Sequence, residues 1–187
     1  MPRRARARDA ALVVGGWVAL LWLLEIIDTV TDHALDTYGI TPRQVGELRD
    51  VVPAAFLHFG FDHLVANTLP LMVLGFLAAL SGVRRFLSVV AVIILVSGLG
   101  VWLVAPANSL TAGASGVVFG LFGYLVVRGF VDRRVGDVLV GLLVGAVYGS
   151  ILWGALPGET GVSWQAHLFG LIGGVVAALA FRRPTAA

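Results

Sequence analysis

An uncharged stretch of 42 residues, from 86 to 127, lies between Arg85 and Arg128. As a single helix rising about 1.5 Å per residue it would be roughly 60 Å long, about twice the ~30 Å thickness of a bilayer core. The stretch must therefore enter the membrane and return. A proline, an asparagine and a run of small residues near its middle predict a turn, so we expect two helices, at 86–104 and 115–127.

The second of these helices is short for a membrane span. Its residues, 115–127, rise only about 20 Å. If Arg128 marks the inner surface, Ser115 begins below the outer surface, and the segment 106–114 must dip into the membrane to meet it. Irregular backbone at that depth is tolerated only where protein buries it or water reaches it. We therefore expect protein or water around Ser115.

Composition and charge placement indicate a polytopic membrane protein. Hydrophobic residues make up 58% of the 187 residues and charged residues only 13%. A net charge of +2 could indicate a nucleic-acid partner, but the arginines alternate with segments almost free of positive charge, as the positive-inside rule describes. We expect no nucleic-acid partner, a lipid bilayer environment, and both chain ends in the cytoplasm. Eleven of the thirteen basic residues, all arginine, lie at 3, 4, 6, 8, 84, 85, 128, 133, 134, 182 and 183.

The predicted fold is an all-α membrane protein with six spans in one domain, residues 10–183. A basic cytoplasmic tail, 1–9, precedes it, and a tail at 184–187 follows it. The loop 28–60 carries five acids against two arginines, which favours the external side. No small-residue cleavage site follows the first apolar run, so this run is interpreted as a retained span. The expected spans are about 10–27, 64–83, 86–104, 115–127, 138–156 and 164–181.

Few strongly polar side chains lie at membrane depth in spans two to six. Counted back to the cytoplasmic arginines, Ser115 is about 20 Å, His167 about 22 Å and Asn67 about 25 Å above the inner surface. These three residues are therefore expected in one layer near the outer side, with His63 at its edge.

Each of these residues also has a purely structural interpretation. A membrane serine commonly bonds back to its own helix, and the small residues 113–116 could let two helices pack closely. Asn67 alone is typical of a hydrogen bond between helices. His167 could be a structural histidine with its hydrogen bonds satisfied, although ionisable groups inside the bilayer are costly and usually functional.

Together, these residues suit nucleophilic catalysis. A serine hydroxyl becomes a good nucleophile when a neutral imidazole takes its proton. Burial keeps His167 neutral, and Ser115 begins a helix, so its N–H lacks an intrahelical partner and the positive end of the helix dipole lies there. Asn67 and His63, four residues apart on one helix face, can add donors for a developing oxyanion.

No acid is expected at this depth to orient His167, so the pattern predicts a dyad. Asp62 and Glu159 are the nearest acids in the sequence, and both should lie in the external layer. Cysteine is absent, which excludes thiol chemistry. His58, His63 and His167 could bind a metal in principle, but no His-Glu-x-x-His pair occurs. We expect neither a metal nor a cofactor.

Three motifs in this order resemble the rhomboid intramembrane serine proteases. They are His63 to Asn67 in the second span, Gly113 to Gly116 at the start of the fourth, and Ala166 to Gly170, with Gly174, in the sixth. The resemblance extends over residues 56–174.

The resemblance implies that Ser115 is the nucleophile and His167 its general base. It implies an oxyanion site made by His63, Asn67 and the Ser115 N–H, with Gly113 shaping the adjoining loop. The reaction would be hydrolysis, through an acyl-enzyme, of a peptide bond in or near a transmembrane segment of another protein. Gly170 and Gly174 would let span six pack tightly on span four, and water would reach the site from the outer side.

Two positions depart from the family pattern. Many members carry a Trp-Arg pair in the first external loop, where this chain has no tryptophan, and some have a tyrosine one turn after the nucleophile, where this chain has Phe119. A phenylalanine can still stack on His167 but cannot offer a phenolic hydrogen bond.

Two other functions compete with proteolysis. A non-catalytic rhomboid-like protein would bind transmembrane clients, but such a protein should lack Ser115 or His167. A small transporter should carry charged groups or paired broken helices along a path, and spans two to six show neither. The sequence does not identify the substrate or the oligomeric state, and its arginine-only basic residues and small size favour a bacterial plasma membrane.

Overall fold

The computed structural model describes residues 3–158 and 161–183. Residues 1–2, Glu159 and the expected tail at 184–187 lie outside this part of the chain. The described residues are helical, apart from turns, loops and one isolated antiparallel bridge between Ile40 and Thr111. The elements are α1 (Arg3–Val30), η1 (Ala34–Tyr38), η2 (Val45–Val51), η3 (Pro53–Phe56), α2 (Phe61–Ala79), α3 (Val83–Val104), α4 (Ser115–Asp132), α5 (Val135–Tyr148), η4 (Gly149–Ala155) and α6 (Trp164–Ala180).

The predicted all-helical membrane fold is confirmed at this level. By length and composition, five described helical stretches could cross a membrane: α1, α2, α3, α4 and the continuous stretch of α5 and η4, Val135–Ala155. The sixth helix, α6, is apolar but shorter. The count of six spans and the cytoplasmic location of both chain ends stay predictions.

The helices α2, α3 and α5 each begin three residues before the ranges expected from hydropathy, and two helices extend by five residues or more beyond theirs. The helix α1 begins at Arg3, inside the expected basic tail, because alternating arginine and alanine are good helix formers. The helix α4 continues past Val127 to Asp132. Hydropathy therefore located the apolar part of each helix but not its polar end.

Buried ion pairs explain why α4 continues. Arg128, which we expected to mark the inner surface, is 6% exposed. Its Nη2 donates to both carboxylate oxygens of Asp137, at 3.0 and 3.1 Å. Asp132 lies 3.7 Å from Arg128 and 3.5 Å from Arg85, and the Arg85 Nε donates to Tyr124 at 3.0 Å. Paired in this way, the charges can be buried.

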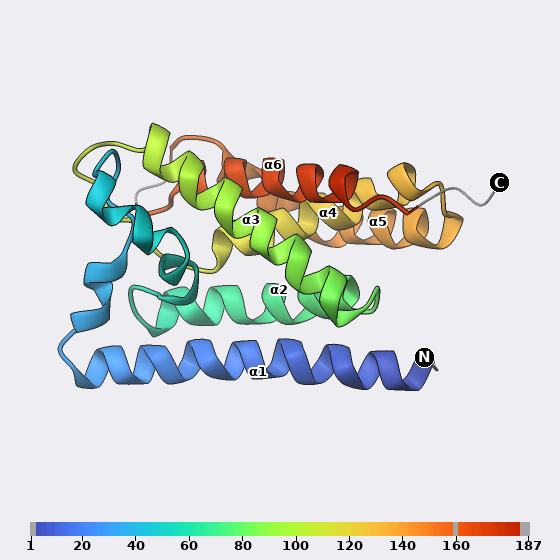
Figure 1. The fold of residues 1–187 in the computed structure, drawn as a ribbon, viewed down its shortest axis with the longest axis horizontal. Coiled ribbons are helices and arrows are strands. Elements are labelled where there is room, and N and C mark those ends of the chain that lie inside the picture. The colour runs from blue at the N-terminus through green and yellow to red at the C-terminus, as the bar shows by residue number, and fades with distance from the viewer. Residues whose placement is uncertain (1–2, 159–160, 184–187) are drawn as a thin grey trace.

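The helix α4 is the most buried of the five membrane-span candidates among the described residues, and it packs closely on α6 (Figure 1). Glycines face each other across this contact: a Cβ at Gly170 would overlap the carbonyl of Gly116, and one at Gly174 would overlap that of Gly120. Small residues of this kind let two helix backbones approach. The contact fixes the position of α6 relative to the start of α4.

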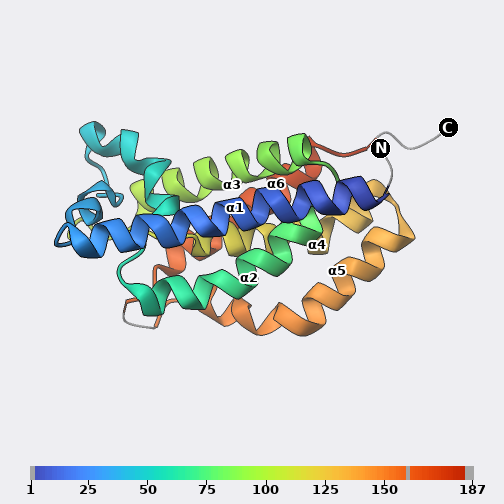
Figure 2. The same ribbon diagram turned by 90° about the horizontal axis from the view of Figure 1, so that it is seen from below.

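The bundle has two distinct ends. The helix α1 begins and α6 ends at the same end, while η1, η2 and η3 lie at the opposite end (Figures 1 and 2). The loop bearing these short helices is attached to the end of α3: Arg43 Nη1 donates to the Ala105 carbonyl at 2.7 Å, and Trp102 Nε1 donates to the Gln44 carbonyl at 2.9 Å.

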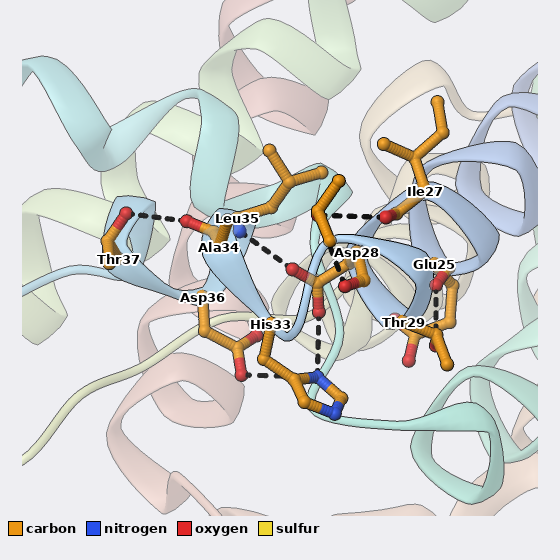
Figure 3. A network of polar contacts seen from close by, with 10 residues as sticks. Glu25, Ile27, Asp28, Thr29, His33, Ala34, Leu35, Asp36 and Thr37 are labelled. Carbon is orange, nitrogen blue, oxygen red and sulfur yellow. Dashed lines mark hydrogen bonds and ion pairs between the residues drawn. The ribbon is translucent and has the colours of Figure 1, made fainter.

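A polar cluster closes the turn after α1 (Figure 3). Asp28 accepts a hydrogen bond from the Leu35 N–H at 2.7 Å, and its other oxygen lies 3.0 Å from His33 Nδ1. Asp36 lies 3.8 Å from the same nitrogen. The hydrogen bond to Asp28 raises the pKa of His33 above its ordinary value. The cluster therefore fixes where the loop 31–60 leaves α1.

Candidate active site

A cavity of about 610 Å³ lies among α2, α4, α6 and the segments that precede α4 and α6. Four of the predicted site residues line it: His63 and Asn67 from α2, Ser115 from α4 and His167 from α6. The structure thus brings together residues that are 104 positions apart at the extremes (63 to 167). Phe59, Ser109, Phe119, Gly161, Ser163 and Trp164 are also among the lining residues.

Ser115 is the first residue of α4. The first N–H groups of a helix have no intrahelical acceptor, and the positive end of the helix dipole lies there. The segment leading to Ser115 is held by the loop between α1 and α2: the Gly113 N–H donates to the Ala54 carbonyl at 2.9 Å, and Ile40 exchanges two backbone hydrogen bonds with Thr111. The serine therefore lies at a helix start whose preceding segment is fixed by that loop.

Gly113 permits a close contact between this segment and His63. Its φ is +133°, a conformation that residues with a side chain rarely adopt. A Cβ at this position would lie 2.7 Å from Cε1 and 2.9 Å from Nε2 of the His63 ring. Only glycine leaves room for the imidazole beside the backbone that leads to Ser115.

His58 belongs to this arrangement, although the sequence suggested it only as a possible metal ligand. Its Nε2 accepts a hydrogen bond from the Ala114 N–H at 3.2 Å, and its ring meets that of His63 edge to face at 5.1 Å. Burial, together with the neighbouring His63, lowers the pKa of His58 to about 3. The imidazole is therefore neutral and acts as an acceptor. No spacing rule in the sequence points to this contact.

Asn67 is 6% exposed, and its Nδ2 donates to the His63 carbonyl one turn earlier at 2.9 Å. An amide nitrogen carries two hydrogens. One of them fixes the side chain against its own helix, and the other can serve the cavity.

His167 is 8% exposed and lies between a carbonyl and an aromatic ring. Its Nδ1 is 2.8 Å from the Gly154 carbonyl oxygen in η4. Because a carbonyl only accepts, this contact assigns the proton to Nδ1 and leaves Nε2 as the basic nitrogen. Phe119 stacks on the ring, with the ring centroids 3.9 Å apart and an interplanar angle of 7°. This confirms that a phenylalanine can stack there.

The Gly154 carbonyl thus has the orienting role for which the sequence offered no acid. Asp62 is exposed and is not among the residues lining the cavity. The start of α6 is fixed separately, because Ser97 Oγ on α3 donates to the Ala166 carbonyl at 2.9 Å. These contacts set both the position and the tautomer of His167.

A group of side chains spaced like metal ligands lies outside the cavity. In the part of the chain that the structure describes, Asp28, His33 and Asp36 have one potential ligand atom each within 4.8 Å of one another. None of the three lines the cavity. His58, His63 and His167, named from the sequence as conceivable ligands, do not form such a group.

Comparisons with known proteins show what the chain is similar to. The rhomboid domain model matches residues 45–184. The uncharacterized protein Rv1337 of Mycobacterium tuberculosis is 45% identical over 185 residues, covering 92% of this chain and 77% of that protein. YdcA of Bacillus subtilis, whose name describes it as a candidate rhomboid protease, is 31% identical over 83% of this chain and 80% of its own length. The rhomboid protease GluP of the same organism is 27% identical over 90% of this chain and 34% of its own length.

Proposed function

Because this chain belongs to the rhomboid family, we propose that it is an intramembrane serine protease acting on transmembrane proteins. The observation that carries the proposal is that Ser115 and His167 line one cavity. Ser115 lies at the start of α4, and the Nδ1 of His167 faces the Gly154 carbonyl. A neutral imidazole with a basic Nε2 is what a serine nucleophile requires.

In the proposed reaction, Nε2 of His167 takes the proton from the Ser115 hydroxyl as its oxygen attacks the scissile carbonyl carbon. The tetrahedral intermediate collapses, the peptide C–N bond breaks, and the same proton passes to the leaving nitrogen. A water molecule, deprotonated by His167, then cleaves the acyl-enzyme ester and regenerates Ser115. The cavity admits the water for this second half of the reaction.

The negative oxygen of each tetrahedral intermediate needs preorganised donors. We assign this role to the Ser115 N–H, the Asn67 amide and the His63 ring. Gly113 lets His63 approach, and His58 supports the turn by accepting from the Ala114 N–H. Gly170 and Gly174 keep α6 against α4, so His167 stays at the depth of Ser115.

The proposed topology follows the arginines. Six spans within residues 10–183 place both chain ends in the cytoplasm and the loop 28–60 outside. The cavity then opens to the extracytoplasmic side of a bacterial plasma membrane. Substrates would be single-span proteins cut within or near their membrane segment.

The experiment that tests the proposal is labelling of the detergent-solubilised protein with a fluorophosphonate probe, followed by turnover of a generic transmembrane substrate in lipid. Ser115→Ala and His167→Ala should each abolish both signals. Ser109→Ala is the matched control, since this serine lines the same cavity but its Oγ donates to the Pro106 carbonyl; it should label like the wild type.

Turnover in either the Ser115→Ala or the His167→Ala variant would eliminate the dyad. A folded wild-type protein that neither labels nor cuts would instead favour the non-catalytic client-binding function.

A further inference from the structure

The helix α1 begins and α6 ends at the end of the bundle opposite the loop 31–60 (Figure 2). A second cavity lies there. Its volume is about 220 Å³, and α1, α2, α4, α5 and the residues after α6 contribute to it. The charged residues of its lining are Arg6, Arg128, Asp137 and Arg183, and the apolar ones are Leu77, Leu80, Leu125 and Val140.

A neighbouring cavity of about 480 Å³ lies around the turn between α2 and α3. It shares Arg6 and Ser81 with the 220 Å³ cavity and adds Arg84, Arg85 and Asp9. Each cavity therefore has two arginines of its own, Arg128 and Arg183 in one and Arg84 and Arg85 in the other, with Arg6 between them.

The acids nearby balance only part of this charge: the two cavities are lined by Arg6, Arg84, Arg85, Arg128 and Arg183, against Asp9, Asp137 and the adjoining Asp132. Asp132 and Asp137 are engaged by Arg85 and Arg128 in the buried network described above. Among the described residues, the side chains of Arg6, Arg84 and Arg183 form no ion pair. Burial and the positive charges of Arg128, Arg85 and Arg134 lower the pKa of Arg183. Positive charge thus accumulates at both cavities.

The chemistry of the lining selects the class of ligand. Arginine binds phosphate oxygens through two parallel charge-assisted hydrogen bonds. The leucines and the valine of the 220 Å³ cavity lie beside its charged groups, and they suit an acyl chain rather than a free inorganic ion. Basic sites at the ends of membrane helices are typical of anionic lipid headgroups. Two arginine sets joined by one shared arginine suit two phosphates held a short distance apart.

We propose that these two cavities bind one anionic phospholipid with two phosphodiester groups, of the cardiolipin class. One phosphate lies between Arg128 and Arg183, the other between Arg84 and Arg85, and Arg6 contacts both. An acyl chain follows Leu77 and Val140. The lipid connects α1, the α2–α3 turn and α5, at the end of the bundle away from Ser115, so the proposal is independent of the proposed protease activity.

The test measures lipid retention by native mass spectrometry after the protein is exchanged into detergent with cardiolipin, phosphatidylglycerol, phosphatidylcholine or inorganic phosphate. One bound cardiolipin per chain is expected, with weaker phosphatidylglycerol binding. The double variant Arg6→Gln/Arg183→Gln should lower cardiolipin affinity roughly 25-fold, at about 5-fold per arginine. Both side chains lie outside the buried ion-pair network, and the backbone hydrogen bond from the Arg183 N–H to Asp132 is retained in the variant. Circular dichroism with gel filtration checks that the variant is folded.

The matched control is Arg8→Gln. Arg8 lies on α1 near Arg6 and is exposed but lines neither cavity, so its substitution should leave the affinity unchanged. An equal loss in the Arg8 and double variants would show only general surface attraction and overturn the site. Phosphatidylglycerol binding as tight as cardiolipin would overturn the two-phosphate assignment. Displacement of the lipid by millimolar inorganic phosphate alone would overturn the role of the acyl chain.

Discussion

Gly113→Ala tests whether the approach of His63 to the serine turn matters for the reaction. The substitution has two separable effects. An alanine at a φ of +133° strains the backbone, with an expected stability loss of about 1–3 kcal/mol. Its Cβ would also lie 2.7 Å from His63 Cε1, whereas carbon atoms pack at about 3.5–4.0 Å. The imidazole must therefore move by on the order of 1 Å.

A displacement of that size in an active site can lower the rate about 100-fold, and we expect this decrease in the rate of fluorophosphonate labelling. Gly82→Ala is the matched control. Its φ is +114°, and an added Cβ meets no atom within 4 Å. This variant should lose a similar amount of stability, measured by unfolding in mixed micelles, but label at the wild-type rate.

The comparison isolates the contact with His63 from the backbone strain. If Gly113→Ala labels as fast as Gly82→Ala while both are destabilised, the contact between Gly113 and His63 has no part in catalysis. The assignment of His63 to the oxyanion site would then be withdrawn.

Three further predictions concern single side chains. Asn67→Ala should slow turnover on the order of 10- to 1000-fold, as expected for one oxyanion donor among several; an unchanged rate would remove Asn67 from the site. Arg128→Met leaves Asp132 and Asp137 undercompensated and should cost about 3–5 kcal/mol in the same unfolding assay, while a neutral effect would contradict the buried network. His58, with its pKa lowered to about 3, stays neutral when folded. The free energy of unfolding should therefore have its full value above pH 6.5, near the ordinary pKa of histidine, and should fall by about 1.4 kcal/mol per pH unit below it. His58→Ala should flatten this pH dependence, and a profile identical to that of the wild type would refute the assignment.

Local patterns in the sequence were sufficient to predict the membrane fold. Hydropathy and helix rise located the apolar part of each helix, because the preference of a side chain for lipid or water depends little on its neighbours. The same depth count put Ser115, Asn67 and His167 in one layer, and all three line one cavity. Their catalytic roles rest on the resemblance to rhomboid proteases and await the labelling experiment.

The polar ends of the helices were less predictable. Arg128 was expected to mark the inner surface, which stays a prediction; the structure adds that its side chain is buried in the protein, where Asp132 and Asp137 approach it from two helices. A hydropathy sum scores every charged residue as costly to bury. Only the oppositely charged side chains that the fold brings close to it offset that desolvation cost.

What the sequence determined by itself is the class of protein, the approximate helices and the set of residues able to form the site. Only the tertiary structure decided what holds those residues in place: the Gly154 carbonyl for His167, the His58 ring for the turn before Ser115, and the Ala54 carbonyl for Gly113. Lipid solubility and helix rise are properties of short segments, so a sequence displays them. The choice of a backbone carbonyl or an imidazole as a partner depends on how distant helices and loops pack together, and no local pattern records it.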